Sequence, residues 1–391
     1  MNTPIRRPPD RIVIVGGGIS GLSIAVRLSQ SGLPVTVLES GYLGDGASSR
    51  NQGWLYSGAW FAPRQLSLAI ACYESFKQTV HLCDECLEPA TASMIYLISS
   101  PATPVSYWTD AWGAAGIPYG GLSIEEAIAE TGVAGPVVRH AFRLPDRAIQ
   151  TDVLLAFLTA KAEHQGVEIR TRTSVSRLMK VGDEVRGVVT STDTEIPARL
   201  VILAANVHGA DLWPSTTRAG YQTEFTRVCL KTHCLTVRPR VANSPYCIVD
   251  LEGFNQVPHA DRSILGSSRW LAATDSRERT LVPGEIDRLR RLLKSAHPQF
   301  DATQHEIIEW AGCTMQAMHS HQVEPGVAPM PTVIDHECEP PRVKNLLSVF
   351  PGRATLWPQL AELARIAVMD KIQSKNPRSA EASWVAANWL N

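Results

Sequence analysis

The sequence predicts an α/β protein made of one parallel-sheet domain and a second, mainly antiparallel domain. Three observations predict it: a glycine-rich turn between an apolar run and a helical pattern at 11–40, a second apolar run at 199–205, and separated strand-like segments between Lys231 and Trp310. The chain has 391 residues, a length that favours two domains over one small core.

The glycine-rich turn follows the apolar run at 12–15. Gly16, Gly18 and Gly21 match the G-x-G-x-x-G pattern of a Rossmann-type domain. In that pattern the glycines permit a tight turn, a close approach of the backbone to a pyrophosphate, and close packing of the following helix on the strand. The turn therefore predicts a bound dinucleotide.

The elements after the turn complete this unit. A helix is expected at 20–31, with its positive end at the pyrophosphate, and Gly32 stops it. A second buried strand at 35–38 ends in Glu39, at the spacing from which a carboxylate accepts hydrogen bonds from a ribose. The order strand, turn, helix, strand and acid predicts a dinucleotide without a 2′-phosphate.

A loop rich in glycine, serine and asparagine follows Glu39. Its hydroxyl and backbone N–H groups suit phosphate oxygens, and Arg50 supplies a positive charge. The alternative is a solvated surface loop, which would leave the aromatic residues Trp54, Tyr56 and Trp60 exposed. The first interpretation accounts for more of the residues.

The rest of the chain continues in α/β order and then changes. Before the change we expect helices at 64–86, 124–130 and 151–164, strands at 94–98 and 167–170, a hairpin at 173–189 with its turn at Gly182, and a buried parallel strand at 199–205 with a helix start near Gly209. After it we expect strands at 233–238, 246–249 and 263–267 and a helix at 284–296.

The C-terminal part returns to the first domain. A strand from Leu346 breaks at Pro351-Gly352, and a long helix follows with Thr355 as its N-cap and Pro358 in its first turn. The tail after Pro377 is expected to be peripheral. The predicted domain segments are 10–90, 146–220 and 341–376 for the dinucleotide domain, and 91–145 and 221–340 for the substrate domain.

Composition and charge exclude several classes of protein. A net charge of -1 gives no general case for binding nucleic acid. No apolar stretch is long enough for a membrane span, and eight scattered cysteines favour a reducing cytosol. Cys83 and Cys86 form a C-x-x-C without a second pair, so we favour helical packing over a metal or redox role. We therefore expect a cytoplasmic protein with no metal, and leave a homo-oligomer open.

Several blocks carry a family resemblance. GASSRNQGWLYSGA (46–59) is similar to G-A-x-x-R-N-x-G-x-x-H-S-G-A, and CLEPA (86–90) to C-V-E-P. LPDRAIQTDVLL, VILAANVHGADL and FPGRATLWPQLAELA also match in place. The chain thus resembles the FAD-dependent oxidoreductases of the D-amino-acid-oxidase-like superfamily, in particular the large subunit of anaerobic glycerol-3-phosphate dehydrogenase and the 2-hydroxyglutarate oxidases.

The resemblance implies FAD as the cofactor, with contacts from residues in several regions of the chain. These are Gly16, Gly18, Ile19, Ser20, Gly21, Glu39, Ser40, Ser48, Ser49, Arg50, Asn51, Gly53, Val175, Ala204, Ala205, Gly352, Arg353, Ala354 and Thr355. A reduced flavin carries negative charge near N1, which the helix start at Thr355 and Arg353 would stabilise.

Three positions depart from the family pattern. The histidine of H-S-G, a general base or substrate contact, is Tyr56 here. Thr355-Leu356-Trp357-Pro358 lacks the arginine of T-T-Y-R that resembles a phosphate anchor, which argues against glycerol 3-phosphate. The glycine after the two alanines is Asn206, a change expected to alter the turn beside the cofactor.

The sequence supports one leading function and leaves alternatives. We expect an enzyme that removes a hydride from a C–H bond beside an amine or hydroxyl of a small substrate and passes electrons to oxygen or a quinone-like acceptor. The alternatives are a flavin monooxygenase and a catalytically weak, flavin-carrying component of a larger complex. The candidate catalytic residues are Tyr56, Arg269 and His319, and Trp60, Trp270 and His321 are further pocket candidates.

Three of these candidates have ordinary explanations as well. Arg269 either clamps a substrate carboxylate or makes a surface ion pair. His319 and His321 either face the substrate or are loop or strand residues with no role in the chemistry.

Overall fold

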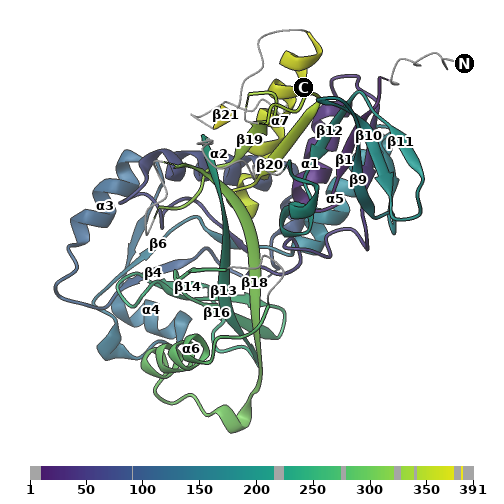
Figure 1. Cartoon of the computed structure of the whole chain (residues 1–391). Helices are drawn as coiled ribbons and strands as arrows, with labels where there is room; N and C mark the ends of the chain where they lie inside the picture. Colours follow the sequence, from purple (N-terminus) through teal and green to yellow (C-terminus); the bar gives the residue numbers. More distant parts are fainter. Residues whose placement is uncertain are drawn as a thin grey trace, which may run out of the picture. The chain divides into compact units, whose positions relative to one another are not determined.

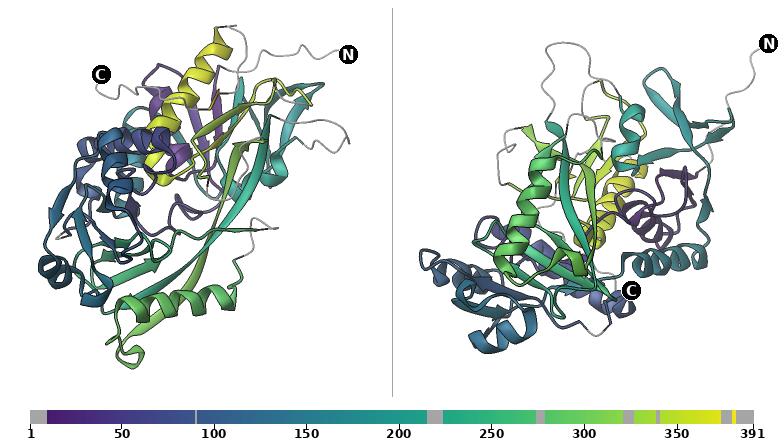
Figure 2. Two further views of the ribbon diagram at one scale, coloured as in Figure 1. Left: turned by 90° about the vertical axis from the view of Figure 1, so that its left-hand side faces the viewer. Right: turned by 90° about the horizontal axis from the view of Figure 1, so that it is seen from below.

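The computed structural model shows two compact units, seen in Figures 1 and 2. It describes residues 10–89, 91–214, 224–273, 279–320, 327–338, 341–373 and 380–381. Unit 1 comprises 1–49, 154–228 and 315–391, and unit 2 comprises 50–153 and 229–314.

Unit 1 is built on a mainly parallel sheet. Its order is β21-β19-β20-β12-β1-β2-β8, and the five strands from β20 to β8 run parallel. The strands are β1 (Ile12–Val15), β2 (Val35–Leu38), β8 (Glu168–Arg170), β12 (Leu200–Leu203), β19 (Thr332–Asp335), β20 (Leu346–Phe350) and β21 (Ala380–Glu381). The predicted parallel sheet is confirmed, with the runs at 12–15 and 199–205 paired side by side.

Alternating side chains of this sheet pack against two different layers. Val13 and Val15 of β1 lie in one core cluster with Val185 and Val188 of the small sheet β11-β10-β9. On the other face, Ile14 lies beside Gly21 in the first helix. The added elements are α1 (Ile19–Ser29), α5 (Thr151–His164), α7 (Trp357–Ile372), β9 (Val175–Val181), β10 (Glu184–Thr190) and β11 (Glu195–Pro197).

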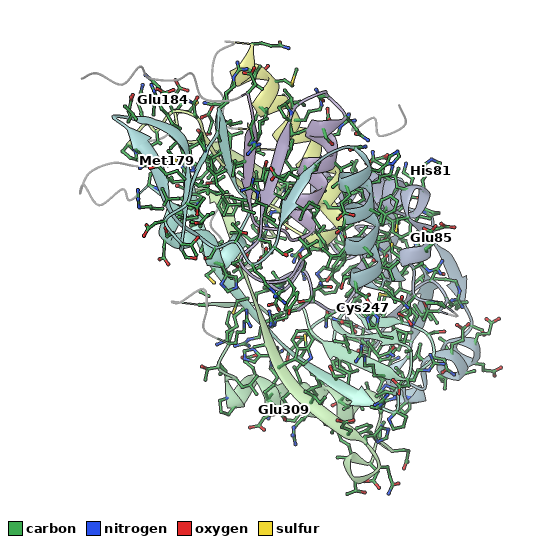
Figure 3. The ribbon with its side chains drawn as sticks, turned by 90° about the vertical axis from the view of Figure 1, so that its right-hand side faces the viewer. His81, Glu85, Met179, Glu184, Cys247 and Glu309 are labelled. Carbon is green, nitrogen blue, oxygen red and sulfur yellow. The ribbon has the colours of Figure 1, made fainter. Side chains whose placement is uncertain are left out.

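The first and last helices of unit 1 pack together. Arg27 of α1 donates from Nε to Glu362 Oε2 of α7 at 2.6 Å, and both side chains are largely buried. The hairpin β9–β10, which carries Met179 and Glu184 in Figure 3, turns at Gly182 as predicted. Chain segments far apart in sequence thus form one domain.

Unit 2 is built on a nine-stranded, mainly antiparallel sheet, with order β17-β13-β16-β15-β14-β4-β6-β5 and β18 paired to β13. Among the pairs of this sheet with a described register, only β14 and β4 run parallel. The strands are β4 (Ile95–Ile98), β5 (Gly120–Leu122), β6 (His140–Arg143), β13 (Phe225–Arg238), β14 (Tyr246–Ile248), β15 (Phe254–His259), β16 (Arg262–Gly266), β17 (Leu271–Ala272) and β18 (Glu306–His319).

Helices cover one face of this sheet. Leu289 and Leu293 of the amphipathic helix at 283–296 pack against Tyr246 and Phe254 of the sheet. The remaining elements of the unit are β3 (Trp54–Leu55), β7 (Arg147–Ala148), α2 (Leu66–Leu82), α3 (Val105–Ala114), α4 (Ile124–Thr131) and α6 (Pro283–Ala296). The expected antiparallel domain is therefore present.

Some boundaries differ from the expected ones. The segment after Ala205 forms a 3-10 helix, η3 (Asn206–Leu212), whose first residue, Asn206, has a positive φ. Thr355 is not the N-cap of the last helix: it lies in the 3-10 turn η6 (Ala354–Leu356), and Leu356 holds the N-cap position of α7. Pro358 lies in the first turn, as predicted.

Other expectations were incomplete. The sequence pattern did not predict β15, β18 and β19, nor the short strands β3, β5, β6, β7, β11, β17 and β21. His321 and the tail after Pro377, apart from Ala380–Glu381, lie outside the described residues. The remaining short 3-10 turns are η1 (Asp84–Cys86), η2 (Gly135–Val137) and η4 (Ala302–Gln304). Within the ranges described, no helix combines the length and the apolar character that crossing a bilayer requires.

The C-x-x-C pair lies where α2 ends and η1 begins. Cys83 and Cys86 are both buried, and burial raises the pKa of each thiol. A redox or metal-binding cysteine needs the opposite shift, toward the thiolate. The environment of the pair therefore favours the packing role.

Candidate functional site

The predicted dinucleotide residues of unit 1 follow the ends of adjacent strands. Gly16 follows β1, Glu39 follows β2, Ala204 follows β12, and Gly352 comes two residues after β20. These strands are parallel neighbours, in the order β20-β12-β1-β2. Ligands of open α/β sheets bind outside the carboxyl ends of the strands. The fold therefore gathers at one sheet edge residues that are more than 300 positions apart in sequence.

Two glycines of the turn leave no room for a side chain. Gly16 has φ +115°, and a Cβ there would lie 2.7 Å from the carbonyl oxygen of Ala204. A Cβ on Gly21 would overlap the carbonyl oxygen of Gly16. The turn can thus press against both the strand end at Ala204 and the first turn of α1 only because these positions lack side chains.

The backbone N–H groups around the turn have defined partners. Glu39 Oε2 accepts from Gly17 N at 2.7 Å, and its Oε1 accepts from Gly41 N at 2.9 Å. Ser48 Oγ accepts from Ile19 N at 3.0 Å. Glu39 Oε1 also accepts from Ser40 Oγ at 3.0 Å, whereas Glu39 Oε2 can accept from a further donor. Gly18 holds the N-cap position of α1, so other N–H groups of the first turn have no partner within the helix and suit an anion.

The C-terminal side of the site is fixed by a glutamine that sequence reasoning missed. Gln316, 1% exposed, accepts from Gly352 N through Oε1 at 2.9 Å and donates from Nε2 to Gly352 O at 3.2 Å. Gly352 has φ +65°, and a Cβ there would lie 2.7 Å from Pro329 O. A side-chain amide therefore holds the glycine that precedes η6 and α7.

Asn206 replaces the family's glycine and makes a similar clamp. Its φ of +49° is a left-handed value that asparagine tolerates. Its Nδ2 donates to Met315 O at 3.1 Å, and its Oδ1 accepts from Met315 N at 2.9 Å. The asparagine thus makes two hydrogen bonds to β18 that a glycine could not make.

Substitutions at Asn206 should separate the contribution of its hydrogen bonds to stability from that of its backbone conformation. We expect Asn206→Gly, which keeps the positive φ, to lower the free energy of unfolding by about 1–2 kcal/mol through the lost hydrogen bonds. Asn206→Ala should cost about 1 kcal/mol more because alanine is strained at this φ. Urea unfolding at equal protein concentration measures both. Equal stability of Asn206→Gly and wild type would contradict a stabilising clamp.

The other predicted cofactor residues lie in both units. Within unit 1, Ser40 Oγ donates to Glu39 Oε1 at 3.0 Å, Ser49 Oγ donates to Gly46 O at 3.3 Å, and Val175 begins β9. Arg353 and Ala354 lie between Gly352 and α7. Arg50, Asn51 and Gly53 fall in unit 2. Their contacts with FAD stay predictions.

The loop 50–53 lies against the sheet of unit 2. A Cβ on Gly266 of β16 would overlap the Gln52 side chain, and one on Gly312 of β18 would lie 2.8 Å from Arg50 O. His259 Nε2 is 2.8 Å from Gln52 O, and its Nδ1 is 3.3 Å from Glu88 Oε2. Glu88 belongs to the CLEPA block. That block therefore helps to hold the loop in which cofactor contacts were predicted.

Tyr56 lies in unit 2 just after β3, and its side chain is half-buried. Its ring stacks on Trp54, with centroids 4.2 Å apart and planes 17° apart, and also contacts Phe61. Trp54 Nε1 donates to Asp146 Oδ1 at 2.9 Å. The residue at the family's histidine position is therefore part of an aromatic stack with a buried carboxylate behind it.

The other pocket candidates lie in different surroundings. Arg269 is exposed and its Nε lies 3.1 Å from Glu285 Oε1, an arrangement typical of a surface ion pair. His319, at the end of β18 in unit 1, stacks on Phe225 at 4.4 Å. Trp60 packs on Trp108, and Trp270 is half-buried. Roles for these residues in the chemistry stay predictions.

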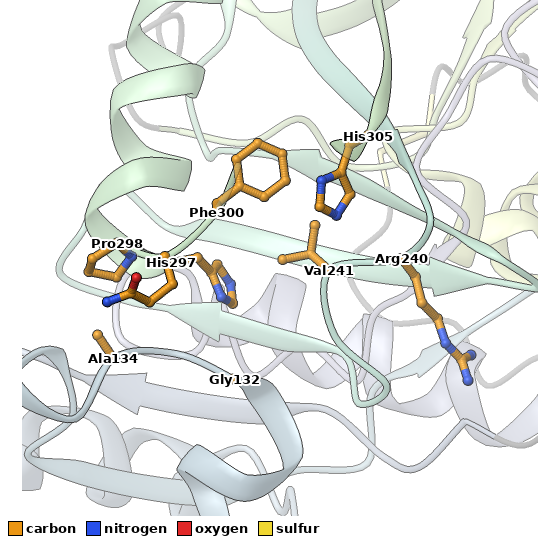
Figure 4. A pocket seen from close by; sticks show the side chains of 9 residues that line it. Gly132, Ala134, Arg240, Val241, His297, Pro298, Phe300 and His305 are labelled. Carbon is orange, nitrogen blue, oxygen red and sulfur yellow. The ribbon is translucent and has the colours of Figure 1, made fainter. Parts of the chain in front are cut away.

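A hollow of about 260 Å³ in unit 2 is lined by nine residues and shown in Figure 4. It contains none of the predicted site residues. His297 lines this hollow, and its Nε2 forms a hydrogen bond of 2.7 Å with the Tyr246 hydroxyl. The His297 ring also forms a hydrogen bond with the Gly132 backbone. These hydrogen bonds therefore hold the His297 side chain against the core of unit 2.

This histidine predicts a pH dependence of stability. Burial lowers the pKa of His297 from 6.5 to about 4. Between these values the unfolded chain binds more protons than the folded one, so the free energy of unfolding falls as pH falls from 6.5 to 4, by up to about 3 kcal/mol. Denaturant unfolding across this range measures it. His297→Gln should remove this part of the slope, and an unchanged slope would contradict the assignment.

Comparison with known proteins agrees with this geometry. The family model for FAD dependent oxidoreductase matches residues 11–343. One of the subunits of anaerobic glycerol-3-phosphate dehydrogenase from Escherichia coli K12 is 27% identical over 203 residues, which are 51% of this chain and 38% of that protein. Glycine oxidase of Pseudomonas aeruginosa is 30% identical over 215 residues, 52% of this chain and 57% of that enzyme. The matched region thus spans between a third and two-fifths of the Escherichia coli protein.

Solved structures share the fold over nearly the whole chain. Glycine oxidase from Geobacillus kaustophilus has a TM-score of 0.69 at 21% identity, covering 95% of this chain and 97% of that one. L-α-glycerophosphate oxidase from Mycoplasma pneumoniae with FAD bound has a TM-score of 0.71 at 18% identity, covering 97% and 98%.

The residues present fit FAD. The close-packed glycine turn matches a diphosphate, and Glu39 at the next strand end suits a ribose, because its Oε2 accepts one hydrogen bond and can accept a second. Gly352, held by Gln316, leads into a helix whose positive end suits a reduced flavin. With the family match over residues 11–343, the dinucleotide is FAD. The chain belongs to the FAD-dependent oxidoreductase family.

Proposed function

We propose that this chain oxidises a small amine or amino acid by removing a hydride from the C–H bond next to nitrogen, and passes the electrons to oxygen or a quinone-like acceptor. The observation that carries the proposal is the convergence of Gly16, Glu39 and Gly352 at the carboxyl ends of neighbouring parallel strands. FAD supplies the hydride acceptor when it is bound.

The residues of unit 1 would hold the cofactor in three parts. The turn at 16–21 would hold the diphosphate through backbone N–H groups, and Glu39 would accept from the adenosine ribose. The segment 352–355 and the start of α7 would lie at the ring, where the positive helix end favours the extra electron pair. At the flavin ring, the residues of this chain would orient the ring and stabilise its negative charge.

Tyr56 favours nitrogen over oxygen in the substrate. An alcohol must lose its hydroxyl proton as the hydride leaves, and the family's histidine suits that role. A phenol is protonated at neutral pH and so donates a hydrogen bond rather than removing a proton. A neutral amine carries its own lone pair and needs no such base. Glycerol 3-phosphate is also disfavoured, because Pro358 stands at the position of the arginine in T-T-Y-R. Trp357 and Pro358 are both buried in α7.

The names of several structural neighbours also favour a substrate that contains nitrogen. They include glycine oxidase, L-proline dehydrogenase from P. horikoshii and L-amino acid deaminase from Proteus vulgaris. L-α-glycerophosphate oxidase is among them too. These likenesses are below 25% identity and support the fold, so the substrate must be found by experiment.

Anaerobic reduction of the bound flavin tests the proposal. The holoprotein is mixed with amino acids, N-methyl amino acids, secondary amines and 2-hydroxy acids, and bleaching of the flavin absorbance is recorded. We expect reduction by at least one amine and none by glycerol 3-phosphate. Reduction by hydroxy acids alone would overturn the amine assignment.

The same experiment decides between the alternatives. Reduction by a nicotinamide donor alone would indicate a monooxygenase. Failure of every donor, with FAD bound and dithionite reducing it normally, would favour a flavin-carrying component of a larger complex.

A further inference from the structure

Asp146 is a fully buried carboxylate that the proposed chemistry does not use. It is 0% exposed. Its Oδ1 accepts from Trp54 Nε1 at 2.9 Å and from the Tyr96 hydroxyl at 3.3 Å, and its Oδ2 accepts from the Ser57 hydroxyl. Three donors from two separate segments thus converge on one side chain of the LPDRA segment.

This carboxylate is costly to bury. In the described part of the chain it forms no ion pair, and burial raises its pKa while the hydrogen bonds from Ser57 and Trp54 oppose that shift. Burial, with Asp146 nearby, also raises the pKa of Tyr96 and of Cys247, which Figure 3 labels, so neither of these groups supplies a positive charge. An apolar residue would avoid the desolvation penalty. The advantage of a carboxylate at position 146 must therefore lie in the conformation that its hydrogen bonds impose on the neighbouring residues.

That geometry concerns the segment that carries Tyr56. Trp54 and Ser57 lie on either side of Tyr56 in the chain, and both donate to Asp146. The Trp54 ring, fixed at its N–H, is the surface on which the Tyr56 ring stacks. The backbone is tied as well, because Trp54 pairs with Ala148, two residues beyond Asp146. The orientation of the Tyr56 ring therefore follows from bonds that end on Asp146.

We propose that Asp146 is a positioning residue that, through Trp54 and Ser57, fixes the Tyr56 ring in the orientation that meets the substrate. The inference rests on the proposed function in so far as Tyr56 contacts the substrate. It adds a link between two sequence blocks, 46–59 and 144–155, that are far apart in the chain.

Matched serine substitutions test this role. Ser57→Ala removes a hydroxyl that donates to Asp146. Ser99→Ala removes one that donates to another carboxylate of unit 2, Asp250, at 2.6 Å. Trp54→Phe keeps a ring beneath Tyr56 but removes the N–H. Each full-length variant is purified with FAD, and its flavin content, melting temperature, kcat and KM with the best amine of the panel are measured.

The expected results differ between the variants. Ser57→Ala and Trp54→Phe should keep their FAD content and lose about 10- to 100-fold in kcat/KM, because a small misplacement of a substrate contact has effects of this size. Ser99→Ala should stay within about threefold of wild type, as expected of a site away from the reaction. If all three variants lose activity in proportion to melting temperature, the role is structural and the proposal is overturned.

A second readout does not depend on turnover. The Trp54–Tyr56 stack contributes to the near-ultraviolet circular dichroism, and the difference between wild type and Tyr56→Leu defines that contribution. Ser57→Ala should lose it and Ser99→Ala should keep it. An unchanged signal in Ser57→Ala overturns the proposal. If no amine reduces the wild-type flavin, the proposed function fails, and the dichroism still decides whether Asp146 orders Tyr56.

Discussion

Gly21→Ala is expected to yield a protein that carries no FAD. A Cβ at this position would overlap the carbonyl oxygen of Gly16, which is backbone and cannot swing aside as a side chain can. The first turn of α1 must then move away from β1, together with the N–H groups that we propose to hold the diphosphate. We expect the FAD content to fall to near zero and the free energy of unfolding to fall by about 3 kcal/mol, the upper range for overpacking.

Gly113→Ala is the matched control. Gly113 lies in α3, is exposed, and a Cβ there would meet nothing within 4 Å. Alanine is the better helix former by about 1 kcal/mol, so this variant should bind FAD normally and be as stable as wild type or more so. Absorbance at the flavin band per mole of protein measures the cofactor content. Normal FAD content in Gly21→Ala would show that the turn does not hold the diphosphate.

The dinucleotide half of the site could be predicted because its rules are local. The glycines at 16, 18 and 21 act on the strand before them and the helix after them, and these lie within 30 residues. Glu39 follows a strand whose four residues, three of them apolar, are all buried. The pairing of the runs at 12–15 and 200–203 was also accessible, since fully apolar strands favour a parallel sheet covered on both faces.

Gln316 and Asp146 could not be found in this way. Gln316 reaches Gly352 only because of where β18 lies, and this strand alternates only in its first half before becoming buried on both sides. Asp146 follows a proline, a context in which an acid usually indicates an exposed turn. Its three donors lie about 50 to 92 residues away. Contacts between residues that only the tertiary fold brings together leave no pattern in the local sequence.

Glu39→Gln should weaken FAD binding by about 100-fold, although the substitution hardly changes the shape of the side chain. Both oxygens of Glu39 accept from backbone N–H groups, Oε2 from Gly17 at 2.7 Å and Oε1 from Gly41 at 2.9 Å. An amide has only one acceptor oxygen, so its NH₂ group must face one of these donors. A hydrogen bond to a charged group contributes about 1.5–3 kcal/mol, and the substitution also alters the carboxylate that we propose as the acceptor for the ribose.

Titration of apoprotein with FAD, followed by flavin fluorescence, measures this effect, and Glu168→Gln supplies the control. Glu168 lies on β8, the strand next to β2, and its carboxylate bonds Thr36 and Arg170 rather than the glycine turn. The control should bind FAD within about twofold of wild type, because partly exposed pairs of this kind contribute little. If the two variants bind FAD equally well, the carboxylate at the end of β2 supports neither the turn nor the ribose. In that case Gly17 and the N-terminus of α1 must hold the adenosine half of the cofactor alone.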